Sequence, residues 1–577
     1  MEKNNGGFCN DEFNTALSRM IISASGWRGV FAADGNEESD TPSISAAHAA
    51  IVSTAAAAFA AYLKKTHSMK QPFVITGIDA RPTGMAVAKA LIAALKREGC
   101  VVQHTGVIAV PEIMSYARSL GNCAFVYISA SHNPIGHNGI KFGLCDGGVL
   151  APEEAAALIA IFKTLCTHFK YTGNPPPAYE FPPSDNGKIS AEKAYTAFTS
   201  EVISGEHDGA KQEAVLQQLR AAFALRPLGI AADFNGSARA VSIDRAYFQN
   251  LGIRFSAINE RAGQIAHRIV PEGESLEPCR QFLEKLHTRD SAYILGYVPD
   301  CDGDRGNLVI WDAVRGAARA LEAQEVFALA VYAELRFLAA RNVDMSRVAV
   351  AVNDPTSMRV DEIAGRFGAR VARAEVGEAN VVALARKLQQ EGWTVRPLGE
   401  GAAGGVIIHP SCVRDPLDTI GALLKLLSAG ETLEVALVDI PQWTTTGAYS
   451  EGAVLKITTP EHGLLKERYR RIFLREWEAK RNMLREKYGI TSWRSFRYNG
   501  IEECETVVFS DAGRGGLKIV FYDECAAARA ALWMRGSGTE PVFRIMADVK
   551  GGDTAFETGL LDWQRAMVLE ADSLDVE

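Results

Sequence analysis

Residues 127–143 read YISASHNPIGHNGIKFG, a run of β-forming residues that ends at a serine and passes into residues suited to a turn. Ser131 stands where the apolar run stops, His132 and Asn133 follow it, and Lys141 comes after two glycines. This order predicts a buried strand whose carboxyl end presents Ser131 in a polar loop. A serine that only caps a following helix is the structural alternative.

Four other β-rich runs end in the same way, in a polar or small-residue cluster that precedes a helical stretch. They are PFVITGIDARPTG at 72–84, LGIAADFNGSA at 228–238, YILGYVPDCDGDR at 293–305 and VAVAVNDPTS at 348–357. Continuous apolar runs that alternate with helices are typical of parallel strands covered on both faces. Ligands of such sheets collect at the carboxyl ends of the strands. The sequence therefore predicts an α/β fold with its functional loops at those ends.

A chain of 577 residues is too long for one hydrophobic core and should divide into several domains. Candidate linkers are the proline-rich stretch at 171–187, the region at 311–319 and the segment at 440–447. We therefore predict three α/β domains and a smaller C-terminal domain. Their predicted bounds are 1–200, 201–318, 319–440 and 441–577.

The composition is that of an ordinary globular protein, with a net charge of −8 that argues against a nucleic-acid-binding surface. Ten cysteines, no two within twenty residues of each other, form neither a zinc pattern nor a dense disulfide framework. A reducing cytoplasm is the expected setting, since the N-terminal residues have no apolar core of the signal-peptide kind. The alanine-rich stretch at 45–65 is expected to be a buried or amphipathic helix rather than a membrane span.

The stretch at 466–497 is rich in basic residues, with 11 basic against 4 acidic side chains and with leucines and aromatics interleaved. A nucleic-acid role is one interpretation of such a pattern. In a chain that is acidic as a whole, an exposed amphipathic helix with a basic face is the favoured one.

PDCDGDRG at 299–306 places three aspartates, Asp300, Asp302 and Asp304, at alternate positions. On an extended segment alternate side chains share a face, and three carboxylates that close together require a compensating cation. Oxygen ligands favour a hard divalent ion, most simply Mg²⁺. An EF-hand is excluded, because its sixth and twelfth positions would be Arg305 and Trp311. A solvated acidic turn is the structural alternative.

Two glycine-rich segments carry further candidate ligands. MRGSGTEPVFRI at 534–545 combines glycines with arginines and hydroxyl residues, as an anion cradle does, although a plain hairpin turn has the same composition. LGEGAAGGVIIHP at 398–410 carries Glu400, which is able to accept two sugar hydroxyls or to lie solvated in a flexible loop. SGWRG at 25–29 places Arg28 where it would fork onto a phosphate or sit in a surface turn. No Walker loop occurs, so nucleotide hydrolysis is not indicated.

Ser131 has no nucleophile elbow around it and no evident triad partners. Side chains one residue apart on an extended chain point in opposite directions, so we expect His132 to be a poor proton acceptor for Ser131. A nearby metal ion and cationic residues would instead stabilise a phosphate ester on the serine.

Taken together and in this order, these segments resemble the α-D-phosphohexomutase family, which includes phosphoglucomutases, phosphomannomutases and phosphoglucosamine mutases. SASHNP followed by NGIK is similar to the family's phosphoserine loop, DCDGDR to its metal loop, GEGAAGG to its sugar loop and RGSGTEP to its phosphate loop. The matching segments run from Ser25 to Arg544.

The resemblance implies three similar α/β domains with mixed sheets plus a C-terminal α+β domain, arranged around a central cleft. It implies that Ser131 carries a phosphoryl group and that Ser131, Asp300, Asp302 and Asp304 hold Mg²⁺. The catalytic residues it implies are Ser131, His132, Lys141, Arg28 and Arg305, with Lys141 or His132 moving protons. The substrate-binding residues it implies are Arg28, Asn133, Lys141, Arg305, Glu400, Arg535, Ser537, Gly538, Thr539 and Arg544.

The implied activity is a cytoplasmic, Mg²⁺-dependent hexose phosphomutase, a monomer or homodimer that binds sugar phosphates and neither nucleic acid nor membrane. Glucose phosphates are the first expectation and mannose phosphates the second. Alternatives are a phosphoglucosamine or pentose phosphomutase, a metal-dependent sugar-phosphate phosphatase that uses the same serine, and a non-catalytic sugar-phosphate binder. Ala402 and Ala403 stand where many relatives have a serine, and Gly536 stands in place of a common proline. The basic stretch at 466–497 resembles an insertion in the last domain.

Overall fold

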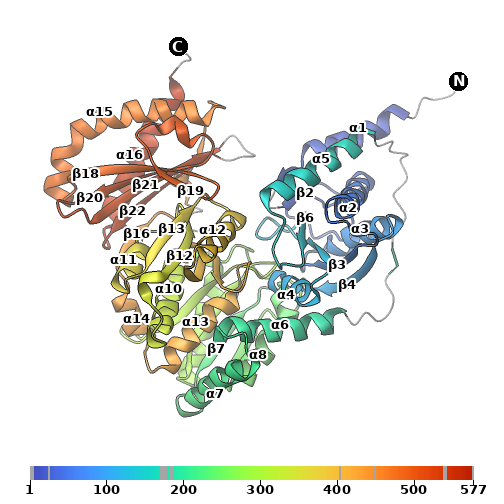
Figure 1. Cartoon of the computed structure of the whole chain (residues 1–577), viewed down its shortest axis with the longest axis horizontal. Helices are drawn as coiled ribbons and strands as arrows, with labels where there is room; N and C mark the ends of the chain where they lie inside the picture. The colour runs from blue at the N-terminus through green and yellow to red at the C-terminus, as the bar shows by residue number, and fades with distance from the viewer. Residues whose placement is uncertain are drawn as a thin grey trace. The chain divides into compact units, whose positions relative to one another are not determined.

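The computed structural model of the chain describes residues 6–23, 26–168, 179–180, 187–401, 405–447, 450–536 and 542–574. These residues form four β-sheets with helices packed on them (Figure 1). The chain separates into two compact units, one holding residues 1–320 and 410–418 and the other holding residues 321–409 and 419–577. The predicted class, mixed α/β sheets with an α+β part at the C-terminus, is confirmed.

The first sheet of the first unit has the strand order β1-β2-β6-β5-β3-β4. Strand β3 is parallel to β4 and to β5, whereas β6 is antiparallel to β5 and to β2. The bounds of its strands are β1 (Ile21–Ser23), β2 (Gly26–Val30), β3 (Phe73–Ile78), β4 (Val101–Val107), β5 (Ala124–Ile128) and β6 (His137–Leu144).

Helices cover both faces of this sheet, so its central strands are apolar on both sides. Val126 packs with the helices of one face and Phe125 and Tyr127 with those of the other, as the two-residue repeat of a strand requires. The helices around it are α1 (Gly6–Ser18), α2 (Ala46–Thr66), α3 (Gly84–Arg97), α4 (Val110–Leu120), α5 (Pro152–His168) and α6 (Gly187–Ser204). Helix α2 is the stretch predicted as a helix at 45–65; it is long and apolar enough to cross a membrane, but most of it is buried within the protein.

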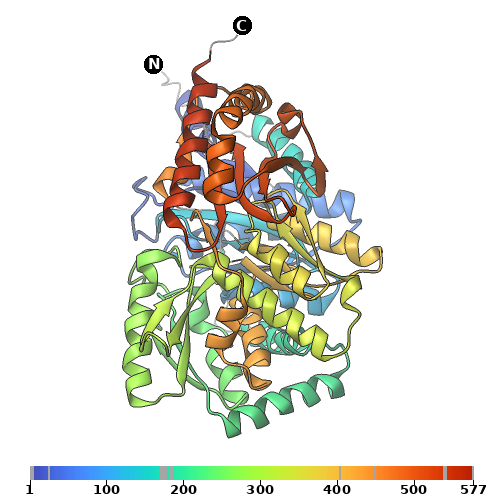
Figure 2. The same ribbon diagram turned by 90° about the vertical axis from the view of Figure 1, so that its left-hand side faces the viewer.

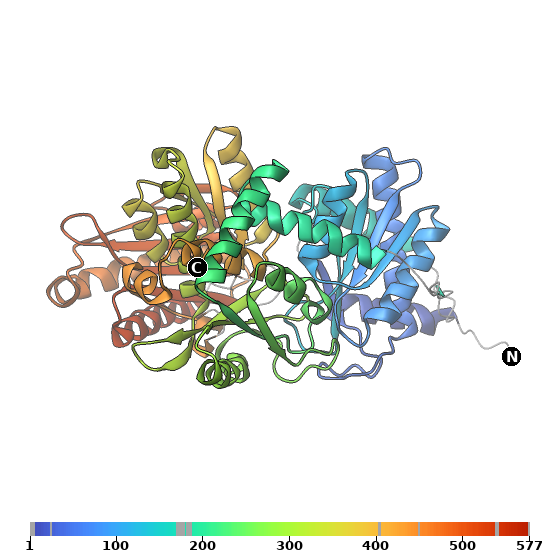
Figure 3. The same cartoon turned by 90° about the horizontal axis from the view of Figure 1, so that it is seen from below.

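The second sheet of the first unit has the order β11-β10-β9-β7-β8. Its strands are β7 (Gly229–Asp233), β8 (Arg254–Ile258), β9 (Tyr293–Pro299), β10 (Gly306–Asp312) and β11 (Ala317–Ala320), and its helices are α7 (Gly209–Leu225), α8 (Asp244–Asn250) and α9 (Glu277–Arg289). Helix α7 contacts α6, which precedes it in the chain (Figure 3). The region at 311–319, predicted as a linker, is instead the β10–β11 hairpin, so the composition of this turn was misleading.

The second unit begins with a four-stranded sheet in the order β13-β12-β14-β15. Its strands are β12 (Val348–Asn353), β13 (Arg370–Ala374), β14 (Thr394–Glu400) and β15 (Gly405–Ile408). The helices packed on it are α10 (Ala323–Ala340), α11 (Arg359–Arg366), α12 (Glu378–Gln390), α13 (Pro416–Ser428) and α14 (Leu433–Asp439).

These three sheets share one arrangement of four strands. In each, the first strand of the set is parallel to the second and the third, and the fourth returns antiparallel to the third. The third and fourth strands are β5 and β6 in the first sheet, β9 and β10 in the second, and β14 and β15 in the third. The similarity of the three α/β parts is thus a property of topology, although the sequence shows no clear internal repeat.

The last sheet is antiparallel throughout and has the order β16-β22-β21-β20-β18-β19, with β17 also paired to β22. Helices α15 (His462–Tyr488) and α16 (Thr554–Ser573) lie side by side on this sheet (Figure 2). The strands are β16 (Trp443–Thr445), β17 (Val454–Lys456), β18 (Ser492–Asn499), β19 (Glu502–Glu505), β20 (Gly516–Tyr522), β21 (Ala528–Gly536) and β22 (Val542–Lys550).

Helix α15 contains most of the basic stretch at 466–497. Its apolar side chains, among them Tyr469, Phe473 and Trp477, are buried in the core of the last sheet, while arginines such as Arg471 and Arg481 are exposed. The expectation of an amphipathic helix with a basic outer face is therefore confirmed.

The predicted domain bounds remain a prediction. Three of the four sheets lie within their predicted ranges, but the boundary predicted at 318/319 falls inside strand β11 of the second sheet and the one at 200/201 falls inside helix α6.

Candidate active site

Ser131 lies in the loop that joins β5 to β6, at the carboxyl end of a fully buried strand. Its φ is 53°, in the left-handed region that a residue with a side chain seldom adopts. The backbone N–H of Ser131 donates to Oγ of Ser129 at 2.8 Å, and Ser131 itself is 3% exposed. The loop thus holds the serine in an uncommon conformation that turns its hydroxyl inward.

Arg81, which follows β3, holds this loop by hydrogen bonds to its backbone carbonyls. Its guanidinium donates to the carbonyls of Ser131 and Asn133, each at 2.6 Å, and to that of Pro134. Its Nε donates to Asp79 at 3.1 Å, and both side chains are inaccessible to solvent. One buried ion pair therefore fixes three carbonyl groups of the serine loop.

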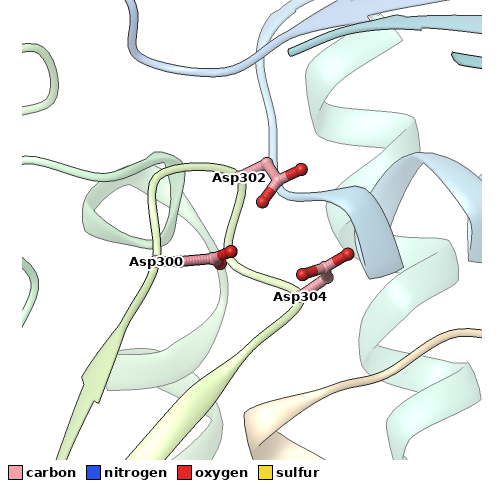
Figure 4. Close-up of side chains that lie close together, drawn as sticks. All are labelled: Asp300, Asp302 and Asp304. Atoms are coloured by element: carbon pink, nitrogen blue, oxygen red, sulfur yellow. The ribbon is translucent and has the colours of Figure 1, made fainter. Parts of the chain in front are cut away.

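Asp300, Asp302 and Asp304 lie in the loop between β9 and β10, and their carboxylates converge (Figure 4). One oxygen from each lies within 4.8 Å of the others, and all three side chains are buried. The Ser131 hydroxyl donates to Oδ2 of Asp300 at 2.9 Å. The structure therefore brings the predicted serine and the predicted acidic trio, about 170 residues apart in the chain, into direct contact.

The first sheet contributes a cation to the same cluster. Lys141, on β6, donates to Oδ2 of Asp302 at 2.8 Å and lies 3.7 Å from Oδ2 of Asp304. Burial opposes the ammonium, but the two carboxylates outweigh it and raise the pKa of Lys141. Burial likewise opposes ionisation of Asp302, yet the Lys141 ammonium holds the pKa of that carboxyl below its usual range. Lys141 and Asp302 are thus an ion pair at neutral pH.

Asp300 behaves differently from its neighbours. Burial, reinforced by the charges of Asp302 and Asp304, raises its pKa well above the usual value for an aspartate. Its Oδ1 accepts the backbone N–H of Gly303 at 3.1 Å and of Arg305 at 3.2 Å. The trio therefore carries more negative charge than the protein alone stabilises.

The trio fits a hard divalent cation. Oδ1 of Asp302 and Oδ1 of Asp304 are buried and have no hydrogen-bond partner anywhere in the described part of the chain. Unsatisfied buried carboxylate oxygens are costly, and a cation with oxygen ligands would satisfy them. The three carboxylates thus supply the ligand set that the sequence predicts for Mg²⁺.

Further cations surround the serine. Arg28, on β2, and Arg305, after the trio, lie close enough to each other for their charges to interact, and both act on His132. Arg414 donates from the segment 410–418 to Oδ2 of Asp304 at 2.8 Å. Positive charges grouped this closely favour the binding of an anion such as phosphate.

The expectation that His132 points away from Ser131 is wrong. Nδ1 of His132 lies 3.4 Å from Oγ of Ser131, because the left-handed conformation of Ser131 departs from the extended chain assumed for that expectation. Burial and then the charges of Arg305 and Arg28 lower the pKa of His132 to about 2, so its imidazole is neutral. The carbonyl of Asn133 accepts from Arg81, and its backbone N–H donates to the carbonyl of Ala130 at 3.1 Å.

The remaining predicted residues lie in the second unit. Glu400 ends β14, is 7% exposed, and its Oε1 accepts the side-chain N–H of Asn353 at 3.1 Å and the backbone N–H of Gly377 at 2.9 Å. Arg535 and Arg544 are directly opposite each other on β21 and β22. The predicted phosphate-loop residues Ser537, Gly538 and Thr539, and the alanines Ala402 and Ala403, lie outside the described residues.

The three predicted loops of the α/β parts occupy one topological position. The serine loop joins β5 to β6, the acidic loop joins β9 to β10, and the Glu400 loop joins β14 to β15. Each is the turn between the third strand and the antiparallel fourth strand of its sheet. This equivalence supports reading the three loops as parts of one kind of site.

Sequence reasoning missed the residues that support the site. Arg81 and Ser129 stood within quoted motifs, but their roles depend on partners about 50 or more residues away. Arg414 had no motif around it, and only its contact with Asp304, 110 residues away, identifies it.

Comparison with known proteins agrees with this geometry. Residues 19–167 match the family model described as phosphoglucomutase/phosphomannomutase, alpha/beta/alpha domain I. A phosphoglucomutase/phosphomannomutase of Thermococcus kodakarensis is 24% identical over 499 residues, which is 86% of this chain and 90% of that protein. A protein of Methanopyrus kandleri named "Probable phosphoglucosamine mutase" is 26% identical over 381 residues, 64% of this chain and 72% of that protein.

Among solved structures, the open form of the Paramecium phosphoglucomutase pp63/parafusin superposes with a TM-score of 0.65 at 15% identity, covering 96% of each chain. The chain therefore has the multidomain α/β fold of that phosphoglucomutase. Residues 19–167 match the first domain of the phosphoglucomutase/phosphomannomutase family, and over most of its length the chain is similar to proteins named as phosphohexomutases.

Proposed function

We propose that this protein is a hexose phosphomutase that interconverts hexose 1-phosphate and hexose 6-phosphate, with glucose phosphates as the preferred substrates and mannose phosphates as the second choice. The proposal is carried by one observation, the Ser131 hydroxyl 2.9 Å from Asp300 inside a buried acidic trio ringed by cations. A serine in that position is suited to carry a phosphoryl group.

Ser131 is the phosphoryl carrier in this scheme. A phosphate on Oγ passes to one hydroxyl of the bound sugar monophosphate, giving a sugar bisphosphate, and the phosphate at the other position then returns to Oγ. In each transfer one P–O bond breaks as another forms, and the proton of the attacking hydroxyl ends on the oxygen that leaves. Phosphoryl transfer depends mainly on positioning and charge stabilisation, which Arg28, Lys141 and Arg305 would provide.

Asp300, Asp302 and Asp304 would hold Mg²⁺ together with a phosphate oxygen on Ser131. The ion supplies charge neutralisation for the trio and for the transferring group. Lys141 and His132 are the groups in this site that would receive or return the sugar proton. His132 is neutral but is a weak base, because burial and the charges of Arg305 and Arg28 lower its pKa to about 2, whereas Lys141 is held in its charged form by Asp302.

The second unit would bind the part of the substrate that does not react. Glu400 would accept hydroxyls of the sugar ring, and Arg535, Ser537, Gly538, Thr539 and Arg544 would hold the phosphate that is not being transferred. Two arginines opposite each other on neighbouring strands repel, and an anion between them removes that repulsion.

Glucosamine phosphate is the alternative substrate, after the glucose and mannose phosphates. It is favoured by the similarity to the Methanopyrus protein, whose name specifies a phosphoglucosamine mutase. The hexoses concerned differ by one substituent, so the choice depends on a few polar contacts around the ring.

A substrate panel tests the proposal. Coupled assays with the 1-phosphates of glucose, mannose, glucosamine, N-acetylglucosamine and ribose should show isomerisation of a hexose phosphate, with glucose 1-phosphate fastest. Intact-mass measurement should find one added phosphate on the wild-type chain after incubation with glucose 1,6-bisphosphate and none on Ser131→Ala. Release of inorganic phosphate without the isomer would point to a phosphatase instead.

Ser131→Ala should reduce turnover by at least about four orders of magnitude, since the phosphoryl carrier is lost. Its stability should change by less than about 1 kcal/mol, because only one hydroxyl is removed. Undiminished isomerisation by this variant would disprove the role of Ser131. Ser131→Gly provides a second variant whose backbone accepts a φ of 53° without strain.

A further inference from the structure

Two of the groups assigned to the substrate, Glu400 and Arg535, are linked through a single short segment. Glu375 and Gly377 are two residues apart, between β13 and α12. The Glu375 carboxylate accepts from Nε of Arg535 at 3.1 Å and from its Nη2 at 3.0 Å, while the backbone N–H of Gly377 donates to Glu400 at 2.9 Å. The segment therefore touches the sugar-binding group with one residue and the phosphate-binding group with the other.

This segment is itself held firmly. Oε2 of Glu375 accepts the backbone N–H of Gly500 at 2.9 Å, and the backbone N–H of Glu375 donates to the carbonyl of Gly500 at 2.8 Å. Gly377 has a φ of 132°, which a residue with a side chain rarely adopts, so the bend after Glu375 depends on glycine. A carboxylate fixed at both ends is able to set the position of the guanidinium that it binds.

Glu375 also balances a local excess of positive charge. Arg535 is opposite Arg544 on the neighbouring strand, and like charges directly across a sheet repel each other. The carboxylate binds Arg535 through Nε and Nη2 and does not occupy Nη1, which also carries N–H donors suited to an anion.

We propose that Glu375 is a positioning residue for the substrate phosphate: it fixes Arg535 at a set distance from Glu400, so that phosphate and sugar ring are recognised together. This inference rests on the proposed function of the same site. Glu375 does not touch the reacting atoms in this proposal, and it acts through Arg535.

The chain offers a matched control. Glu362, on α11, likewise extends from the third sheet to a cation of the last sheet, and it lies 3.0 Å from Nζ of Lys550. Lys550 is at the opposite end of β22 from Arg544, about 20 Å away at the usual rise per residue. Glu375→Gln and Glu362→Gln therefore remove the same kind of ion pair, one beside the substrate groups and one remote from them.

The experiment compares these two variants with the wild-type protein. Glu375→Gln should raise KM for hexose phosphates by about tenfold to a hundredfold, the effect of a lost hydrogen bond to a charged group, while kcat changes by less than about threefold. Glu362→Gln should leave KM within about twofold. Thermal unfolding of both variants checks that they are folded, and Glu375→Asp, whose shorter side chain would miss Arg535, should behave like Glu375→Gln.

Binding separates this inference from the proposed function. Calorimetric titration with glucose 6-phosphate and with inorganic phosphate reports affinity whether or not the protein turns over. If the wild-type protein binds both probes but does not isomerise glucose 6-phosphate, the proposed function fails. Weaker binding by Glu375→Gln than by Glu362→Gln still supports the positioning role in that case. The positioning role is overturned if Glu375→Gln and Glu362→Gln bind the probes equally well, or if the wild-type protein binds neither probe. It is also overturned if the KM of Glu375→Gln falls, because the carboxylate would then compete with the substrate phosphate.

Discussion

Ser131 shows at the scale of one residue how the backbone prepares a hydroxyl for chemistry. The left-handed conformation costs on the order of 1 kcal/mol for a residue with a side chain, so the surrounding structure must impose it. Ser129 holds its N–H, Asp300 accepts its hydroxyl, and Arg81 binds its carbonyl. The strain is therefore balanced by contacts from three separate segments.

Arg81 and Asp79 give a prediction about stability. Arg81→Met leaves the Asp79 carboxylate buried without its cation and frees three carbonyls of the serine loop. We expect the free energy of unfolding to fall by about 3–5 kcal/mol, the usual cost of removing one partner of a buried ion pair. Urea unfolding measures it. Asp79→Asn combined with Arg81→Met should recover part of the loss, and a double variant no more stable than the single one would contradict this account.

Residues that form a local pattern could be predicted from the sequence, and residues that act from a distance could not. Ser131, Lys141 and the aspartate trio stand in compact motifs whose spacing reflects their chemistry. Arg414 does not, because its role exists only where segment 410–418 packs beside Asp304. The orientation of His132 also failed as a prediction, since it depends on a φ angle that no spacing reveals.

At the scale of elements, the β9–β10 loop is the part whose behaviour depends most on an ion. One carboxylate oxygen each of Asp302 and Asp304 is buried without a hydrogen-bond partner in the described residues. This makes the loop unfavourable without a cation and suited to bind one. Strand positions were predictable here because apolar runs marked β3, β5, β7, β9 and β12 in the sequence. Their common four-strand order was not, because pairing partners are set by packing rather than by composition.

Chelation should therefore stop turnover. Thorough treatment with EDTA should abolish hexose phosphate isomerisation, and added Mg²⁺ should restore it, because three carboxylates cannot remain charged together without a cation. Asp304→Asn should need at least about tenfold more Mg²⁺ for half-maximal activity, since one charged ligand is lost. Activity that survives complete chelation would exclude the acidic trio as a metal site.

A second prediction at this scale concerns the contact between the third and last sheets. Lys518, on β20, is buried and donates to the carbonyls of Asp354 and Thr356, each at 3.0 Å. Burial, and then the charge of Arg373, lowers the pKa of Lys518 to about 7. Between pH 7 and about 10 the unfolded chain thus binds a proton at this lysine that the folded chain does not, so the free energy of unfolding rises with pH.

Lys518→Met should remove that contribution. The variant's unfolding free energy, measured by urea titration from pH 7 to 9, should rise less steeply than that of the wild-type protein, by about 1.4 kcal/mol per pH unit. Burial also lowers the pKa of Lys466 to about 7, so Lys466→Met should show a loss of the same sign. Identical slopes for Lys518→Met and the wild-type protein would mean that the ammonium is charged in the folded state.

At the scale of the whole molecule, the chain leaves the first unit at residue 320 and returns to it for residues 410–418. The returning segment brings Arg414 to Asp304, and Asp415 to the buried Arg239 and to the Tyr195 hydroxyl at 2.5 Å. The first unit is thus completed by a piece of chain that is distant in sequence.

This interleaving predicts the behaviour of fragments. A fragment of residues 1–320 lacks Arg414 and Asp415, so buried charges on Asp304 and Arg239 each lose a partner. Its free energy of unfolding should be lower by about 3 kcal/mol or more than that of the same fragment joined to residues 410–418 by a flexible linker. Urea unfolding followed by tryptophan fluorescence compares the two, and equal midpoints would refute a stabilising role for the segment.

The repeated four-strand order also bears on how such a protein could acquire new specificities. Each reactive loop is a short connection between two strands whose frame is the same in three places, so its residues can be exchanged without redesigning the sheet that holds it. Variation in substrate preference should therefore accumulate in the β14–β15 connection while the β5–β6 and β9–β10 connections stay constant. For protein engineering, the chain offers three loop positions with the same flanking strand arrangement, at which new binding residues can be introduced.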